Sequence, residues 1–205
     1  MYVVKTGIHH SGIEGDGVFA GEFIPQGTIV YFYDDKNISV SSAELSFLPE
    51  KEKNKIIKYG VQDEAGNWML GEGAEKLNHS CDANVLSLFV DDIYCEIAIR
   101  DILEGEEITA DYGLFFSSFP YRMECSCNSS ICRRRVSPGE QIDIQTQRMW
   151  HQRISEASSR IFDVKQNLFS TEDETARRLT SAIKSKHSSK ILPYIKFSLI
   201  SQRPP

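Results

Sequence analysis

Apolar residues in the first two thirds of the chain are grouped in short runs, which polar and turn-forming residues separate. The longest runs, 28–33, 85–90 and 93–99, are rich in β-branched and aromatic side chains. Such runs, interrupted by turn signals at intervals of roughly eight to twelve residues, predict short strands. Because Asp91-Asp92 lies between the last two runs, these should pair as a hairpin, and the whole pattern favours a β-rich core.

Shorter apolar runs at Tyr2–Lys5, Val18–Ala20, Trp68–Leu70 and Ile108–Ala110 predict further strands. Residues 9–17 contain several glycines and predict a turn region. Taken alone, this region favours a β-hairpin with permissive turns, although glycine also allows a backbone to approach a ligand closely.

Two other regions predict helices. Residues 42–59 have a helix-like composition of charged and apolar side chains. Further along, turn residues become scarce, and apolar side chains recur near helical spacing from residue 140 to residue 167. Thr171 and Glu174 have the spacing of a capping box, which predicts another helix over 172–186.

The chain has 205 residues, 40% of them hydrophobic and 25% charged, which suits one folded domain with an appendage. It contains no apolar run of membrane-spanning length, and residues 1–5 lack the apolar segment of a signal peptide. The net charge of −6 is uneven: residues 1–139 carry −10 (12 Lys and Arg, 22 Asp and Glu), whereas residues 140–205 carry +4 (11 against 7). An acidic first part would attract a basic peptide and repel a phosphate backbone, although solubility alone also explains an acidic excess.

Cys125, Cys127 and Cys132 form a Cys-x-Cys-x4-Cys run. A structural zinc ion takes four soft ligands in a tetrahedron, with each thiolate at about 2.3 Å. Cys81, 44 residues before Cys125, can supply the fourth thiolate. The alternative is a set of unpaired thiols. This interpretation is weaker, because three of the chain's five cysteines lie so close together. Four zinc-binding cysteines indicate a reducing compartment rather than a disulfide framework.

Three stretches of the chain together carry a resemblance to a known family. Asn78-His79-Ser80-Cys81, Gly105–Tyr112 and the cysteine run at 125–132 resemble, in that order, the NHSC motif, the GEELTxDY motif and the post-SET zinc tail of the SET-domain protein-lysine methyltransferases. Gly15–Ala20 is similar to the centre of that family's first motif. The resemblance covers roughly residues 3–136, about two thirds of the chain.

The resemblance implies a β-rich α+β fold, in which several small β-sheets surround a threaded, pseudoknot-like C-terminal segment. It assigns a SET domain to residues 1–114, with a variable insert at about 42–60 that usually forms part of the substrate groove. A post-SET zinc-binding segment would follow at 115–136. Residues 137–205 lie beyond the resemblance, and their pattern predicts a mostly helical C-terminal extension.

The activity that the resemblance implies is S-adenosylmethionine-dependent N-methylation of lysine in a basic protein, such as a histone tail. Tyr112 matches the family's catalytic tyrosine, and Tyr59 lies where many members carry a second tyrosine in the lysine channel. A tyrosine hydroxyl can orient the amine while it stays neutral at pH 7. Because methyl transfer needs a neutral amine in line with the sulfonium methyl, positioning matters more than a strong base. Without the resemblance, Tyr59 would be an ordinary core or surface tyrosine.

The same resemblance assigns two sets of binding residues. The cofactor S-adenosylmethionine would contact Gly15, Asp16, Gly17, Val18, Asn78, His79 and Tyr112. A structural zinc ion would be held by Cys81, Cys125, Cys127 and Cys132. Asn84, which ends the NHSC motif, should tie two loops together through its amide.

Three positions depart from the family pattern. Ala83 replaces a usual proline, so that turn should be less rigid. Glu75 stands near the place of a usual arginine, which leaves one cofactor contact without a residue. Ala110 replaces a Phe or Tyr that limits how many methyl groups fit, so the number of methyl groups added stays open.

Two further expectations concern residues outside these sets. Cys95 lies within a predicted strand and should be a small buried hydrophobe. Arg133-Arg134-Arg135 should form a solvated basic face rather than a contact with nucleic acid or an acidic partner.

Two alternative functions stay open. The first is a catalytically weak or inactive SET-like interaction module stabilised by zinc, which the departures at Glu75 and Ala110 favour. The second is a nucleic-acid-binding zinc protein that acts through residues 140–205, which the acidic first part disfavours.

The expected partners are a basic, lysine-containing protein substrate and, through the C-terminal extension, a second copy of the chain. No membrane partner and no direct contact with nucleic acid are expected. The expected location is intracellular, in the nucleus (its own or a host's) or in the cytoplasm.

Overall fold

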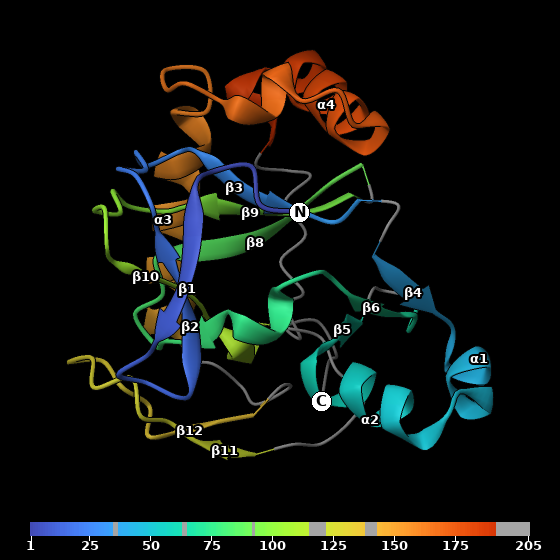
Figure 1. Cartoon of the computed structure of the whole chain (residues 1–205). Coiled ribbons are helices and arrows are strands. Elements are labelled where there is room, and N and C mark those ends of the chain that lie inside the picture. Colours follow the sequence, from blue (N-terminus) through green and yellow to red (C-terminus); the bar gives the residue numbers. More distant parts are fainter. Residues whose placement is uncertain (35–36, 63–64, 92, 115–121, 138–142, 192–205) are drawn as a thin grey trace.

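A computed structural model gives the structure of the chain (Figure 1). It describes the following residues, with side chains up to residue 185: 1–34, 37–62, 65–91, 93–114, 122–137 and 143–191. The end of the predicted C-terminal extension, residues 192–205, lies outside the described residues.

The main hydrophobic core lies on an antiparallel sheet with the strand order β3-β9-β8. These strands are β3 (Ile29–Phe32), β8 (Val85–Val90) and β9 (Ile93–Ala98). All six residues of β9 are buried, because this central strand is covered on both faces. The hairpin predicted for the two longest runs is confirmed, and Asp91 adopts a positive φ of 47° in its turn, which aspartate tolerates better than most residues.

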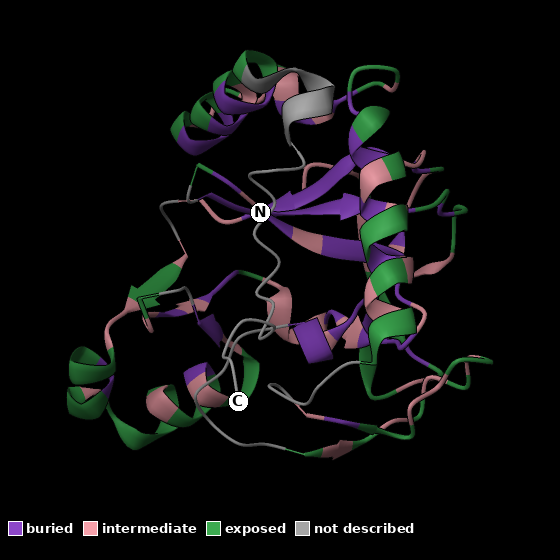
Figure 2. Cartoon of the chain, turned by 180° about the vertical axis from the view of Figure 1, so that it is seen from behind, coloured by how far each residue is buried: buried purple, intermediate pink, exposed green. Residues whose placement is uncertain are grey.

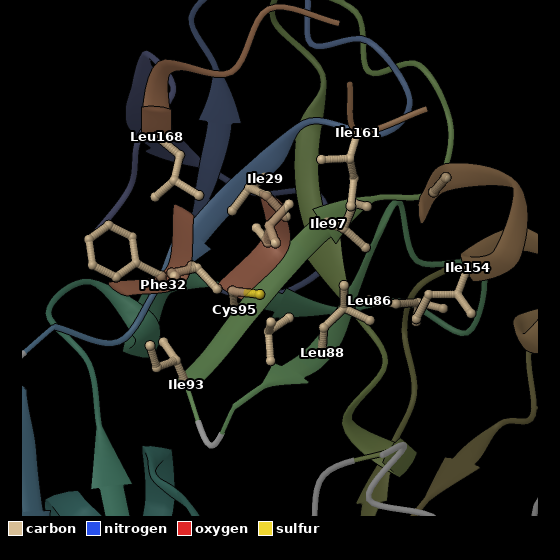
Figure 3. Close-up of a cluster of buried hydrophobic side chains, with 14 of the residues drawn as sticks. Ile29, Phe32, Leu86, Leu88, Ile93, Cys95, Ile97, Ile154, Ile161 and Leu168 are labelled. Atoms are coloured by element: carbon tan, nitrogen blue, oxygen red, sulfur yellow. The ribbon is translucent and has the colours of Figure 1, made fainter. Parts of the chain in front are cut away.

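The residues after 143 fold into helices, as expected, and these helices cover one face of this sheet. The elements are α3 (Ile144–Ser159), η3 (Asn167–Ser170) and α4 (Glu174–Ile191). Figure 3 shows Ile154 and Leu168 of this region in one cluster with Ile29 and Leu86 of the sheet. Cys95 is fully buried in the same cluster, as predicted. Figure 2 shows that α3 keeps its outer face exposed.

A second sheet has the strand order β1-β2-β10-β7. Its strands are β1 (Thr6–His10), β2 (Asp16–Ala20), β7 (Asn78–His79) and β10 (Glu107–Ala110). β10 pairs antiparallel with β2 and parallel with β7, so a late strand lies between two earlier ones. Several small sheets with an inserted late strand confirm the β-rich α+β fold class that the sequence predicted.

A third sheet, with the order β4-β6-β5, and two helices form a smaller unit at one side of the molecule (Figure 1). Its elements are β4 (Ile38–Val40), α1 (Ser42–Phe47), α2 (Glu50–Tyr59), β5 (Val61–Gln62) and β6 (Trp68–Leu70). The region predicted as helical is thus divided in two. Pro49 restricts Leu48 to an extended conformation, which ends α1, and Pro49 itself precedes the first residue of α2.

The remaining elements are short: η1 (Ala74–Lys76), η2 (Tyr112–Leu114), β11 (Met123–Glu124) and β12 (Arg135–Val136). β11 and β12 pair antiparallel on either side of the cysteine run. Within the described residues, no helix has the length and apolar character needed to cross a membrane.

Three predicted boundaries are wrong. The helix predicted from residue 140 to residue 167 already ends at Ser159. The first strand is Thr6–His10 rather than residues 2–5, and its last three residues are exposed. An exposed edge strand lacks the apolar alternation that marks a half-buried one. The last helix is capped by Asp173, whose carboxylate accepts the Ala176 N–H at 3.0 Å, whereas the Thr171 hydroxyl donates to Asn167.

Gln166 ties the helical region to β3. Its buried Nε2 donates to the carbonyls of Gly27 at 2.7 Å and Ile161 at 3.0 Å. Its Oε1 accepts the Ile29 N–H at 3.0 Å. One side-chain amide therefore pairs three backbone groups that burial would otherwise leave unsatisfied.

Replacement of this amide tests the attachment. Gln166→Leu should lower the free energy of unfolding by about 2–4 kcal/mol, because three buried backbone groups lose their partner. Gln145→Leu makes the same change at an exposed position of α3 and should alter the free energy by less than about 0.5 kcal/mol. Equal urea midpoints for the two variants would show that Gln166 does not hold the helices on the sheet.

Candidate functional site

A cavity of about 500 Å³ lies where the three sheets and α2 approach one another. Its volume is within the usual range for sites that bind small molecules. Five of the residues predicted for catalysis or cofactor binding line it: Gly15, Asp16, Tyr59, Asn78 and Tyr112. The sequence therefore predicted residues that are far apart in the chain and share one cavity.

The two predicted catalytic tyrosines reach the cavity from different elements. Tyr112 begins η2, directly after β10, and its hydroxyl donates to the carbonyl of Leu77. Tyr59 ends α2, is 38% exposed, and carries the Lys58 ammonium 4.8 Å from its ring centre. Tyr112 is thus fixed in the wall, whereas Tyr59 lies at the more open side.

Asn78 organises the turn before β2. Its Nδ2 donates to the carbonyls of Glu14 at 3.0 Å and Asp16 at 3.3 Å, and to Glu107 Oε1 at 2.8 Å. A Cβ on Gly17 would lie 2.2 Å from that same Oε1, so only glycine lets the Glu107 side chain reach the turn. Gly15 has a φ of +51°, a conformation that glycine adopts easily.

Val18 and His79, also predicted as cofactor-binding residues, lie behind the cavity wall. Val18 is a residue of β2, and its side chain is fully buried in the hydrophobic core. His79 Nδ1 accepts the Tyr112 N–H at 3.1 Å, so the neutral ring carries its proton on Nε2, which lies 3.3 Å from Cys81 Sγ. Burial lowers the pKa of His79 to about 4, against the opposing effect of Asp111. The imidazole therefore links the backbone of Tyr112 to the cysteine cluster.

Asn84 performs the structural task expected of it. Its Oδ1 accepts the Thr109 N–H at 2.8 Å, and its Nδ2 donates to the Glu107 carbonyl at 2.8 Å. These bonds tie the start of β8 to β10. The preceding Ala83 is fully buried, so the turn without proline is packed closely.

The four predicted zinc ligands, Cys81, Cys125, Cys127 and Cys132, come together. All four Sγ atoms lie within 4.8 Å of one another, and those of Cys81 and Cys125 are 3.7 Å apart. Four thiolates at about 2.3 Å from one zinc ion would lie roughly 3.8 Å apart, so the donor set fits this metal. Backbone N–H groups of Arg133 and Arg134 point at Cys81 Sγ (3.3 Å) and Cys132 Sγ (3.4 Å), which stabilises thiolates.

Asp111 is central to the site, and the sequence analysis missed it. Its fully buried carboxylate accepts hydrogen bonds from Arg133 Nη2, Trp150 Nε1 at 3.1 Å and Gly113 N–H at 2.9 Å. The prediction of a solvated face is therefore wrong for Arg133 and holds for Arg134 and Arg135, which are exposed. The sequence signal for Asp111 was its place in the Gly105–Tyr112 motif, directly before Tyr112.

Glu96 is another residue that the sequence analysis missed as part of the site. Its position on β9 turns it away from Ile97, and it points into the cavity rather than to solvent. It is 2% exposed, and burial raises its pKa to about 7. Tyr94 donates its hydroxyl proton to Glu96 Oε1 at 2.9 Å, which partly opposes this effect.

The rim of the cavity carries paired charges. Lys76 Nζ lies 2.8 Å from Asp16 Oδ2, and Glu75 Oε1 lies 3.7 Å from Lys55 Nζ. Among the described residues that line the cavity, Lys58 and Lys76 are the cations. The rim therefore carries positive charge close to Asp16 and Glu75.

Comparison with known proteins gives a consistent result. The family model of the SET domain matches residues 15–113. "Histone-lysine N-methyltransferase trithorax" of Drosophila virilis is 31% identical over 152 residues, covering 66% of this chain and 4% of that protein. "Histone-lysine N-methyltransferase ATX2" of Arabidopsis thaliana is 31% identical over 156 residues (68% and 14%), and "Histone-lysine N-methyltransferase 2B" of Homo sapiens is 27% identical over 139 residues (63% and 5%). The chain thus spans a small part of the length of these relatives.

The buried carboxyl of Glu96 should make stability depend on pH. The pKa of Glu96 is raised from its ordinary value of 4.5 to about 7 in the folded protein. Protonation of this carboxyl therefore stabilises the fold fully below pH 4.5, and this contribution is lost as the pH rises through 7. Glu96→Gln should remove this loss and be more stable than the wild type at pH 8 by up to about 3 kcal/mol. Glu104→Gln, at an exposed position, should follow the wild-type curve. Parallel curves for the wild type and Glu96→Gln in urea unfolding from pH 4 to 8 would contradict this assignment.

Proposed function

The chain belongs to the SET-domain family through residues 15–113, and from this membership we propose that it is an S-adenosylmethionine-dependent protein-lysine N-methyltransferase. The observation that carries the proposal is the single cavity that collects Tyr112, Tyr59, Asn78 and the Gly15-Asp16 turn. A transferase needs the methyl donor and the acceptor to meet in one enclosed space.

The cofactor end of this cavity is the turn at residues 14–16 with Asn78. The turn supplies backbone groups, and Asn78 holds it in place. The Lys76 ammonium at the rim is a suitable partner for the carboxylate of S-adenosylmethionine, in place of the family's usual arginine. Gly17, Val18 and His79 act from behind the wall, by shaping the turn and by fixing Tyr112. When bound, S-adenosylmethionine supplies an electrophilic methyl group on a sulfonium.

Tyr112 orients the acceptor amine. Its hydroxyl is directed by the Leu77 carbonyl, and its backbone N–H is held by His79. A neutral hydroxyl and nearby carbonyl oxygens place partial negative charge where the transferred methyl group carries positive charge. Tyr59 closes the cavity from the side of α2.

The four cysteines hold a structural zinc ion in this proposal. Zinc would clip the segment between β11 and β12 onto the turn that contains Cys81. Because His79 Nε2 contacts Cys81 Sγ and His79 Nδ1 holds Tyr112, the metal site supports the position of Tyr112. The proposed domains are therefore a SET domain at 1–114, a zinc-binding segment at 115–136 and a helical extension at 137–205.

The proposed substrate is a basic, lysine-containing protein such as a histone tail, and the proposed place of action is the nucleus. The acidic first part of the chain, −10 over residues 1–139, would attract such a substrate. The relatives reported above are named histone-lysine N-methyltransferases, which supports this class. The insert at about 42–60 reaches the cavity through Ile57 to Tyr59 and is suited to contact the substrate.

Tyr112→Phe tests the catalytic assignment. The variant should transfer methyl groups from labelled S-adenosylmethionine to core histones roughly 100-fold more slowly, because the amine loses the hydroxyl that orients it. Cofactor affinity by calorimetry should stay within about twofold of the wild type. Wild-type turnover in the variant would reject Tyr112, whereas a zinc-loaded wild type that neither binds the cofactor nor transfers a methyl group would favour the inactive interaction module.

Cys127→Ser tests the metal assignment independently of activity. The purified variant should lose about one zinc ion per chain, because three thiolates and a hydroxyl bind zinc much more weakly. Cys95→Ala alters a cysteine that is buried in the hydrophobic core, outside the group of four zinc-binding cysteines, so this variant should keep the metal. Zinc content by atomic emission decides the question, and equal content in the two variants would remove the four-cysteine site.

A further inference from the structure

One end of the cavity contains buried oxygen atoms that lack hydrogen-bond partners. Among the described residues, no group bonds to Glu96 Oε2, to the Tyr2 hydroxyl or to the Tyr31 hydroxyl. All three residues line the cavity, and Glu96 and Tyr31 are 2% and 3% exposed. Buried polar atoms without a partner destabilise a fold, so such a group of them indicates a ligand.

The fold holds these oxygens in place through several elements. The strand register puts Tyr31 of β3 and Ser87 of β8 on either side of Glu96 on β9. The Ser87 and Tyr94 hydroxyls are 2.7 Å apart, and Tyr94 donates to Glu96 Oε1. A Cβ on Gly71 would lie 1.7 Å from the Tyr31 hydroxyl, so the chain keeps a glycine where that hydroxyl needs room. One carboxylate oxygen is thus fixed by the protein and the other is left for a ligand.

The walls around Glu96 are aromatic. The rings of Tyr31 and Tyr33 lie 5.4 Å apart, those of Tyr33 and Tyr94 lie 4.7 Å apart, and Tyr2 meets Tyr31 edge-on at 4.8 Å. Aromatic faces attract organic cations and pack against alkyl chains. A buried carboxylate surrounded by tyrosines therefore suits an alkylammonium group.

We propose that Glu96, together with Tyr2, Tyr31 and Tyr94, binds the side-chain amine of the substrate lysine and accepts the proton that its ammonium must lose before methyl transfer. This inference rests on the proposed function. In the step, one N–H bond of the ammonium breaks and an O–H bond forms on Glu96 Oε2, while the lone pair stays on nitrogen. That lone pair then attacks the methyl group, the C–S bond breaks with its electrons on sulfur, and the product is a methylammonium.

An amine fits these groups better than the sulfonium of the cofactor does. A sulfonium has no N–H to donate and would leave all three oxygens without a partner, whereas an ammonium has three donors. Burial also favours the protonated carboxyl of Glu96 and the neutral form of a desolvated lysine, so it favours transfer of the proton from the ammonium to the carboxylate.

The other groups that face Glu96 do not hinder this role. They are the hydroxyls of Tyr2, Tyr31, Tyr33 and Tyr94 and the α-amino group of Met1. Burial raises the pKa of each of these tyrosines above its ordinary value, so they stay neutral. Burial lowers the pKa of the Met1 amino group to about 6. If the pH dependence of amine binding disappears when the Glu96 carboxyl is removed, it arises from Glu96 and not from Met1.

Binding of n-butylammonium to the zinc-loaded, full-length protein tests the subsite without turnover. By NMR titration, the wild type should bind it more tightly as the pH rises from 6 to 8, and Glu96→Gln should bind it at least 10-fold more weakly with no pH dependence. Glu104→Gln should match the wild type, and n-butanol should bind the wild type and Glu96→Gln alike. Equal n-butylammonium affinity in the wild type and Glu96→Gln would overturn the subsite.

Turnover tests the proton acceptor. With labelled S-adenosylmethionine and core histones, Glu96→Gln should lower kcat at least 10-fold at pH 7 and remove the inflection near pH 7, with unchanged cofactor affinity. A variant with the wild-type kcat and pH profile would overturn this inference and leave the proposed function in place. A wild type that transfers no methyl group, yet binds n-butylammonium through Glu96, would reject the proposed function and support the cation subsite.

Discussion

A single buried carboxylate, that of Asp111, joins the parts of the molecule on which the candidate site depends. It accepts hydrogen bonds from Gly113 beside Tyr112, from Arg133 after the cysteine run and from Trp150 of α3. A buried charge without such donors would be strongly unfavourable, so the three segments must meet for the fold to be stable. The turn of Tyr112, the cysteine cluster and the helical region are therefore held by the same two oxygen atoms.

β9 separates the two interiors of the molecule. Its Cys95 and Ile97 pack in the core with the helices, whereas Tyr94 and Glu96 line the cavity. Neighbouring residues of a strand point to opposite faces, so one strand can hold an apolar core and a polar cavity end side by side. The core keeps water from one side of Glu96 and the tyrosines keep it from the other, which explains why a carboxyl within a sheet has a raised pKa.

Sequence patterns predicted the features that nearby residues determine. The hairpin at 85–98 follows from periodicity, and the cysteine cluster from a dense run of thiols with one partner upstream. The contacts of Asp111 could not be predicted, because its donors Arg133 and Trp150 are 22 and 39 residues away and no spacing encodes which donor meets it. The placement of Glu96 depends likewise on which strands flank β9. The five predicted residues that line the cavity were found through motif resemblance, since loops carry no periodicity.

The position of β10 also has a consequence for the synthesis of the chain. β2 and β7 flank β10 in the sheet, yet both leave the ribosome before it does. Their facing edges have no strand to pair with until residues 107–110 emerge, and unpaired edges promote association between nascent chains. The sheet can therefore close only after residues 107–110 have been translated, and such non-local pairing is itself slow. A chaperone that covers these edges before that point would increase the yield of native protein, whereas the same chaperone acting later would have little effect.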